Sequence, residues 1–254
     1  MQGLLGWLKP EVEVKVNAKE KVYPNGFRRV TICSKPVFKN DECMELVTSS
    51  SVSKDKDMSN STRGDSIRRA KEKIYDIAMC NDFEYFITWT LDKEMIDRYD
   101  AKLVSKKLKV FLNNLVKRKE VRYLVVPELH QDGAIHMHGL IAGKLRMVDS
   151  GRKLLDGRSI FNMPEWKLWF STAIELDNQK GRVSSYIVKY VQKDFQKIFG
   201  NFYYAGGHGL VRSPEVNYFD VDFGAFDLPV YGPEGVPILF KYLDVLPDAP
   251  EVVV

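Results

Sequence analysis

The sequence predicts an α+β protein that combines an antiparallel hairpin, a further strand and amphipathic helices. Residues 83–91, FEYFITWTL, alternate aromatic and β-branched side chains, which is typical of a strand covered on both faces. Residues 121–143 contain two apolar runs joined by the turn-forming residues 130–134, HQDGA, and therefore predict two antiparallel strands. Residues 101–119 place their apolar side chains on one stripe, which predicts a helix with one buried face.

Weaker signals predict the remaining elements. A helix is expected from Ser66, because apolar residues follow it at helical spacing. One more strand is expected within residues 163–176, MPEWKLWFSTAIEL, and a second long helix over residues 183–199. Beyond Pro214 the chain is rich in Pro, Gly and aromatic residues, which predicts an irregular tail or a few short strands.

These elements suggest three parts. Residues 1–60 are expected to form an N-terminal extension of short strands that ends in a polar linker. Residues 61–214 are expected to form the main domain, and residues 215–254 an acidic C-terminal tail.

Composition limits the functional classes. Hydrophobic residues make up 44% and charged residues 28%, as is usual for a soluble globular protein. No apolar run is long enough to span a membrane, and the N-terminus lacks the basic segment of a signal peptide. Three cysteines without metal-finger spacing predict a reducing, cytoplasmic environment. The phosphate-binding pattern GxxxxGK[ST] is absent, so no nucleotide-driven motor is expected.

Positive charge is concentrated in one stretch of the chain. Residues 102–122 carry eight basic residues and one acidic residue, whereas the net charge of the whole chain is only +4. Such a patch attracts polyanions, although a solvated helix face is the commoner meaning of a charge run. The candidates for contact with a polyanion lie off the apolar stripe: Lys102, Lys106, Lys109 and Lys117.

Three of the four histidines fall within nine residues. His136 and His138 are two apart on a predicted strand, so their side chains point to the same face and can bind one metal ion. Glu128 on the preceding strand is expected across from His138. His130 has the same parity, so it can replace Glu128 or join it. The alternative is that the two histidines simply lie on the surface of an edge strand.

The predicted helix over residues 183–199 carries two tyrosines and two lysines at four-residue spacing. Tyr186, Tyr190, Lys189 and Lys193 are expected to line one wall of it, because each residue advances by about 100°. A nearby ammonium group favours the phenolate, which is the nucleophilic form of tyrosine. The alternative is a helix that buries two amphipathic tyrosine rings.

In this order the three motifs resemble those of the HUH endonucleases, and among them the rolling-circle replication initiators. The motifs are a hydrophobic strand containing Thr88 and Thr90, then His136-Met-His138, then YIVKYVQK from Tyr186 to Lys193. The segment ELHQDGAIHMH is also similar to the initiators of small single-stranded DNA viruses. The YxxKYxxK pattern resembles that of initiators from isometric single-stranded DNA phages. The resemblance covers roughly residues 66–214.

The resemblance implies a fold, a site and a reaction. The fold is a central antiparallel sheet of about five strands with flanking helices. The metal ligands are Glu128, His136 and His138, in preference to His130, and the cofactor is Mn²⁺ or Mg²⁺. Tyr186 and Tyr190 both attack single-stranded origin DNA to form a 5′-phosphotyrosyl bond, assisted by Lys189 or Lys193. The DNA is bound by Thr88, Thr90, Lys102, Lys106, Lys109 and Lys117.

The implied function is to start rolling-circle replication, with a host helicase and polymerase as partners. Other interpretations remain open at this point. An HUH transposase is possible, whereas a relaxase is disfavoured because its tyrosine usually precedes the histidines. A non-catalytic protein that binds single-stranded DNA and a zinc hydrolase with a His₂Glu site are the alternatives from other classes. The sequence does not indicate an oligomeric state.

Overall fold

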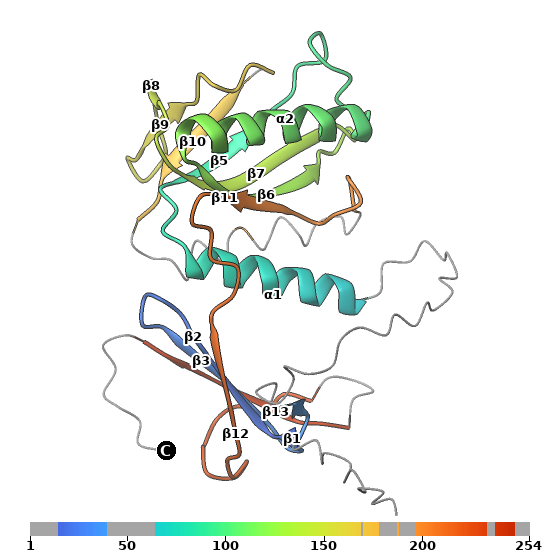
Figure 1. The fold of residues 1–254 in the computed structure, drawn as a ribbon, viewed down its shortest axis with the longest axis vertical. Helices are drawn as coiled ribbons and strands as arrows, with labels where there is room; N and C mark the ends of the chain where they lie inside the picture. The colour runs from blue at the N-terminus through green and yellow to red at the C-terminus, as the bar shows by residue number, and fades with distance from the viewer. Residues whose placement is uncertain are drawn as a thin grey trace, which may run out of the picture. The chain divides into compact units, whose positions relative to one another are not determined.

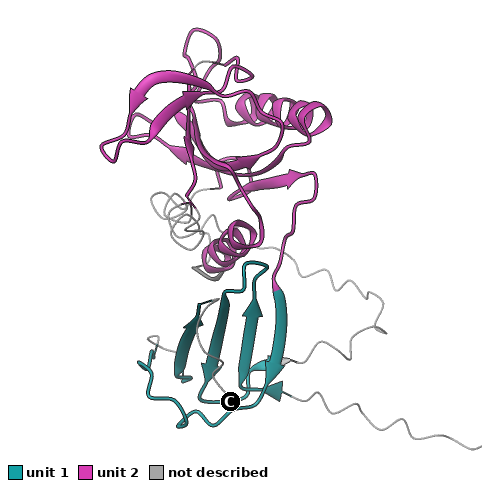
Figure 2. Ribbon diagram, turned by 90° about the vertical axis from the view of Figure 1, so that its left-hand side faces the viewer, with its two compact units in different colours: residues 1–57, 215–254 teal, residues 58–214 magenta. Residues whose placement is uncertain are grey.

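The computed structural model describes residues 15–39, 64–168, 170–177, 187, 197–232 and 237–246. The chain divides into two compact units, shown in Figure 2. The terminal unit consists of residues 1–57 and 215–254, and the central unit of residues 58–214. Strands and helices occur together, so the predicted α+β class is confirmed. No helix in the described part of the chain is long and apolar enough to cross a bilayer.

The terminal unit combines the two ends of the chain. Its four-stranded antiparallel sheet has the order β12-β2-β3-β13, so strands of residues 18–33 pair with strands of residues 215–245. Ala18, Ile32 and Val245 are buried on one face of this sheet. The strands of the unit are β1 (Lys15–Val16), β2 (Ala18–Val22), β3 (Arg28–Cys33), β4 (Phe38–Lys39), β12 (Glu215–Phe219) and β13 (Phe240–Val245).

The central unit is built on a seven-stranded antiparallel sheet with the order β11-β6-β7-β5-β10-β9-β8. The predicted five-stranded sheet is therefore wrong. A hairpin of β8 and β9 extends one edge, and β11 extends the other. The strands are β5 (Tyr85–Trp89), β6 (Arg122–Leu129), β7 (Ile135–Ala142), β8 (Val148–Lys153), β9 (Ser159–Asn162), β10 (Ser171–Glu175) and β11 (Tyr204–Gly207).

The helices α1 and α2 pack on opposite faces of this sheet (Figure 1). The helix α2 (Ala101–Lys119) buries Leu108 and Leu112 against Trp89 and Met137, and its N-terminus is capped by Asp100. The helix α1 (Gly64–Cys80) packs Ile74 and Ile77 into a second core cluster. We call the two surfaces the α1 face and the α2 face. The predicted helix over residues 101–119 is confirmed, and the helix predicted from Ser66 begins two residues earlier.

The second predicted helix, over residues 183–199, lies outside the described residues except at its end and at Ile187. Ile187 is helical and fully buried. Residues 197–199 form a turn instead of a helix, since the backbone N–H of Gly200 donates to the carbonyl of Lys197.

The strand that carries the histidines lies very close to its neighbour. A Cβ atom added at Gly139 of β7 would stand 2.7 Å from the backbone carbonyl oxygen of Leu124 in β6. Real Cβ atoms do not approach an oxygen so closely, so any larger residue would push the two strands apart. The absence of a side chain at this position therefore lets β6 and β7 pair directly beside His138.

Candidate active site

The α1 face carries His136 and His138. Between them, Met137 is fully buried in the opposite core cluster, on the α2 face. His138 is 9% exposed, and its ring lies against Phe86 with centroids 6.2 Å apart and an interplanar angle of 20°. His138 therefore stands at the border between the apolar core below α1 and the open end of the sheet.

A carboxylate of the neighbouring strand reaches His138 diagonally. The Oε2 atom of Glu128 lies 2.9 Å from the Nε2 atom of His138, and both side chains are largely buried. The expected register is wrong by two residues, because Glu128 pairs directly with His136, and His138 pairs with Val126. The hairpin turn is centred on Asp132 and not one residue further along the chain. Parity is unaffected by a shift of two, so Glu128 remains on the same face as both histidines.

The central strand β5 holds the other ring nitrogen of His138. Thr88 pairs with His138 across the sheet, and its Oγ1 lies 3.1 Å from Nδ1. When Nδ1 carries the proton and donates to Thr88, Nε2 has a free lone pair and can bind a cation. Thr88 therefore orients the ring and favours the tautomer in which Nε2 faces Glu128 as a ligand.

We expect Thr88→Val to weaken Mn²⁺ binding by roughly 10- to 100-fold, the usual effect of removing a group that orients a metal-binding histidine. Valine keeps the shape of the side chain but cannot bond to Nδ1. Thr88→Ser keeps the hydroxyl and is the matched control, which should bind Mn²⁺ nearly as the wild type does. Titration followed by electron paramagnetic resonance measures both. Equal affinities for the valine and serine variants would contradict the role of Thr88.

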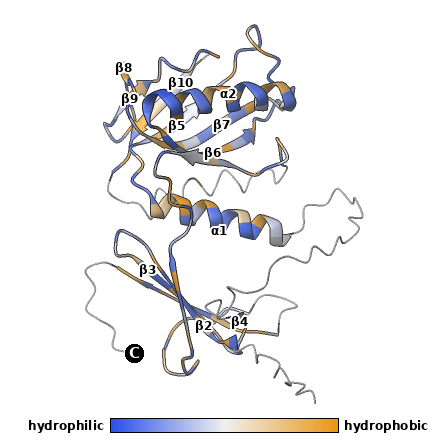
Figure 3. Cartoon of the chain, viewed as in Figure 1, coloured by the Kyte–Doolittle hydropathy of each residue, from blue (hydrophilic) through white to orange (hydrophobic). Residues whose placement is uncertain are grey.

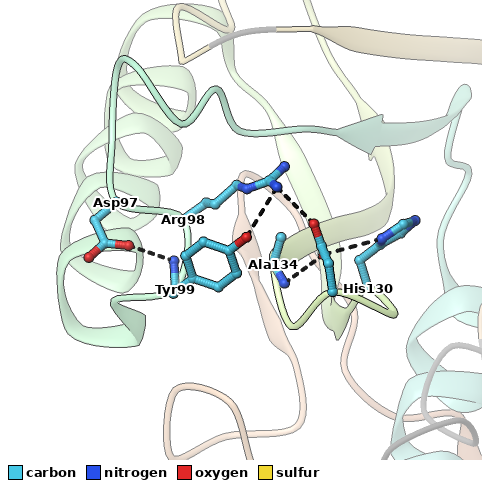
Figure 4. Close-up of polar contacts among 6 residues, drawn as sticks. Asp97, Arg98, Tyr99, His130 and Ala134 are labelled. Carbon is cyan, nitrogen blue, oxygen red and sulfur yellow. Dashed lines mark hydrogen bonds and ion pairs between the residues drawn. The ribbon is translucent and has the colours of Figure 1, made fainter.

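A polar network holds the turn that joins β6 and β7 (Figure 4). The Arg98 guanidinium donates to Asp132 at 2.7 Å and to the hydroxyl of Tyr99 at 3.2 Å. The other carboxylate oxygen of Asp132 lies 3.3 Å from the Nδ1 atom of His130. The ring of His130 in turn stacks on His136, with centroids 5.0 Å apart. His130 thus joins the other histidines on the α1 face, as its parity predicts.

Burial lowers the pKa of His136, and the charges of a protonated His130 and of Arg98 lower it further against the opposing effect of Asp132. The neutral imidazole therefore persists to a lower pH than in an ordinary histidine. Because only neutral imidazole binds a metal, this environment keeps His136 available as a ligand.

The donor set fits a divalent ion in its chemistry. Two imidazoles and a carboxylate on one face suit Mn²⁺, which tolerates nitrogen ligands better than Mg²⁺ does. In the described ranges, however, no three His, Cys, Asp or Glu side chains are placed together as a metal site. The direct contact between Glu128 and His138 occupies the two atoms that would bind the ion. An ion between them would replace this hydrogen bond.

The basic helix lies away from the histidines. Lys102, Lys106, Lys109 and Lys117 are all exposed on α2, which covers the opposite face of the sheet. Figure 3 shows the hydrophilic residues that run along the outer side of this helix. These lysines therefore do not line the surface that carries His136 and His138.

The tyrosine segment meets the sheet at one described position. Tyr186, Tyr190, Lys189 and Lys193 lie outside the described residues. Ile187, however, packs with Leu124, Val126 and Leu140 in the core cluster of the α1 face. The segment that carries the tyrosines thus has a buried residue on the histidine side of the sheet.

The strand β10 contributes to this face in a way that the sequence did not reveal. Thr172 pairs with Thr88, so the row across the sheet is Val126, His138, Thr88 and Thr172. Beyond this row, the backbone N–H of Thr90 donates to the carbonyl of Phe170, whose side chain is 40% exposed. The alternation in residues 171–175 indicates a strand, but only the pairing with β5 shows which of its residues face the histidines.

One comparison with known proteins found a similarity. Residues 84–195, less than half of the chain, match the family of the replication-associated protein ORF2. No curated protein and no solved structure matches. The matched stretch contains Thr88, Glu128, both strand histidines and both tyrosines of the predicted helix. It is consistent with a replication initiator, and it suggests that the chain takes part in the initiation of replication.

Proposed function

We propose that this protein is a replication initiator that nicks and rejoins single-stranded origin DNA through a 5′-phosphotyrosyl intermediate. The observation that supports it best is the arrangement on the α1 face. Glu128, His138 and Thr88 are in contact there, His136 is adjacent, and Ile187 of the tyrosine segment is buried on the same side. The similarity to replication-associated proteins over residues 84–195 points in the same direction.

The proposed reaction is a transesterification. The phenolic oxygen of Tyr190 or Tyr186 forms a bond to the phosphorus of the DNA. The bond between phosphorus and the 3′-oxygen of the preceding nucleotide breaks, and the phenolic proton ends on that oxygen. The free 3′-hydroxyl primes synthesis by a host polymerase, and the reverse reaction rejoins the strand.

The residues of the chain would divide the work. Glu128, His136 and His138 would hold a divalent ion, which when bound supplies a Lewis acid to the phosphate. Thr88 would keep His138 in the ligand tautomer. Lys189 or Lys193 would favour the phenolate, since a tyrosine with its ordinary pKa of about 10 is a poor nucleophile near pH 7. A host helicase would open the duplex ahead of the polymerase.

Incubation with single-stranded DNA from a candidate origin and Mn²⁺ tests the proposal. An adduct that withstands denaturation in detergent, together with release of a 3′-hydroxyl fragment, is expected. DNA binding without any adduct would instead support the non-catalytic DNA-binding protein. Cleavage without an adduct would support a metal-dependent hydrolase.

The lysines of α2 are expected to act only on DNA long enough to pass from one face of the sheet to the other. Lys102→Ala, Lys106→Ala, Lys109→Ala and Lys117→Ala should each weaken binding of long single strands whatever their sequence. Each phosphate that a variant no longer binds should lower the slope of log K against log salt by up to about 0.7. Binding of short oligonucleotides should not change. Unchanged slopes for all four variants on long DNA would identify α2 as a solvated face.

A further inference from the structure

A cavity of about 420 Å³ opens at the edge of the central sheet, beside β11. Its volume is within the range of small-ligand sites. None of the described residues that line it is acidic. The lining combines two cations with three aromatic rings, and its residues are Lys197, Gly200, Asn201, Phe202, Tyr203, Tyr204, Ala205 and Arg212.

The cations and rings of this cavity are held in defined places. The Nζ atom of Lys197 lies 5.5 Å from the centre of the Phe202 ring, and Arg212 donates to the carbonyl of Ala205 at 2.9 Å. Both cations are exposed, whereas Phe202 and Tyr203 are half-buried. Burial raises the pKa of Tyr203 despite the opposing effect of Arg212, so its ring is a neutral phenol at physiological pH. The cavity thus offers flat aromatic surface beside two exposed positive charges.

The cavity borders the face of the sheet that carries the histidines. Phe202, Tyr203 and Ala205 pack against the core cluster that contains Val126 and Leu140. β11 pairs with β6, which pairs with β7, so two strand spacings separate the cavity from the histidine strand. Neighbouring strands lie about 4.8 Å apart, which places β11 roughly 10 Å from β7 across the sheet. A single DNA strand can bridge such a distance with one or two nucleotides.

We propose that this cavity binds a nucleotide of the single-stranded DNA that flanks the phosphate held at the histidines. The base would stack on Phe202 and Tyr203, and a phosphate would contact Lys197 and Arg212. Stacking on aromatic rings combined with cations along the backbone is how proteins bind single strands without strong sequence preference. The inference rests on the proposed function for the position of the cleaved phosphate, and it adds a binding site for a neighbouring nucleotide.

The affinity of the full-length protein for a fluorescent oligothymidylate, measured by anisotropy at several salt concentrations, tests the site. Phe202→Leu keeps an apolar side chain but removes the ring, and is expected to weaken binding by about fivefold or more. The same variant should leave the salt slope unchanged. Lys197→Gln and Arg212→Gln should each lower the slope by up to about 0.7.

Two residues at the other edge of the same sheet provide matched controls. Arg152 and Lys153 are exposed on β8, so Arg152→Gln and Lys153→Gln remove the same charges far from β11. Both controls should bind as the wild type does. An oligonucleotide of abasic sites should bind the wild type and Phe202→Leu equally, because it has no base to stack.

The inference would be overturned if the three cavity variants bound oligothymidylate with wild-type affinity and slope. Losses as large in the β8 controls would also overturn it, since the effect would then be one of net charge. Lys197→Gln and Arg212→Gln change exposed side chains, so they test the site even if Phe202→Leu unfolds. Formation of the covalent adduct is measured separately. Its absence in the wild type would refute the proposed nicking activity, whereas the binding losses would still identify a nucleotide site.

Discussion

His136→Ala and His138→Ala are each expected to abolish formation of the covalent DNA adduct. The two rings share the α1 face with Glu128, and the loss of either leaves too few ligands to hold a divalent ion. His138 is also largely buried and bonded on both ring nitrogens, so its loss breaks the contacts to Glu128 and Thr88 together. Mn²⁺ titration of the same variants should show the loss of the ion along with the loss of activity.

The remaining histidines serve as controls for this result. His208→Ala changes an exposed residue outside the cluster and should leave adduct formation intact. His130→Ala should have a milder effect than His136→Ala, because His130 is more than half exposed and contacts Asp132. If His130→Ala loses Mn²⁺ while Glu128→Ala retains it, the third ligand is His130 and the assignment of Glu128 is wrong.

Elements with strong local periodicity could be predicted from the sequence. The stripe in residues 101–119 indicates the bounds of α2, because its apolar spacing and its Asp100 cap act within a few residues. The hairpin of β6 and β7 could be predicted as well, but a turn centred one residue away moves every partner by two. Local sequence therefore identifies which face Glu128 shares with the histidines, whereas the cross-strand partner depends on the details of the turn.

Features that depend on distant parts of the chain could not be predicted. β8, with the sequence VDSGRK, is almost entirely exposed, so it lacks the apolar alternation that indicates a strand. β11 contains two adjacent glycines, and its pairing with β6 joins residues about eighty positions apart. The terminal sheet joins Asn17 to Val221 by hydrogen bonds in both directions, which no local pattern reveals. Likewise, the charges on α2 show that its outer side is solvated but not which face of the sheet it covers.

Tyr186→Phe and Tyr190→Phe are each expected to form the covalent adduct, and the double variant is expected to form none. Phenylalanine keeps the ring and removes only the nucleophilic oxygen. On an ideal helix Tyr186 and Tyr190 lie about 40° apart, and Ile187 follows about 60° beyond Tyr190. Because Ile187 is buried on the α1 face, this spacing directs both phenols toward the side of the sheet that carries His136 and His138.

Two nucleophiles also suit the proposed reaction cycle. An initiator that remains joined to one 5′ end needs a second tyrosine to cut the regenerated origin. Gel analysis of adducts with origin DNA, followed by peptide mapping of the modified tyrosine in each single variant, tests this. If one single variant forms no adduct, the other tyrosine is structural or auxiliary and only one residue attacks. Tyr190 is then the expected nucleophile, because YVQKD resembles the YxxKD pattern of single-tyrosine viral initiators.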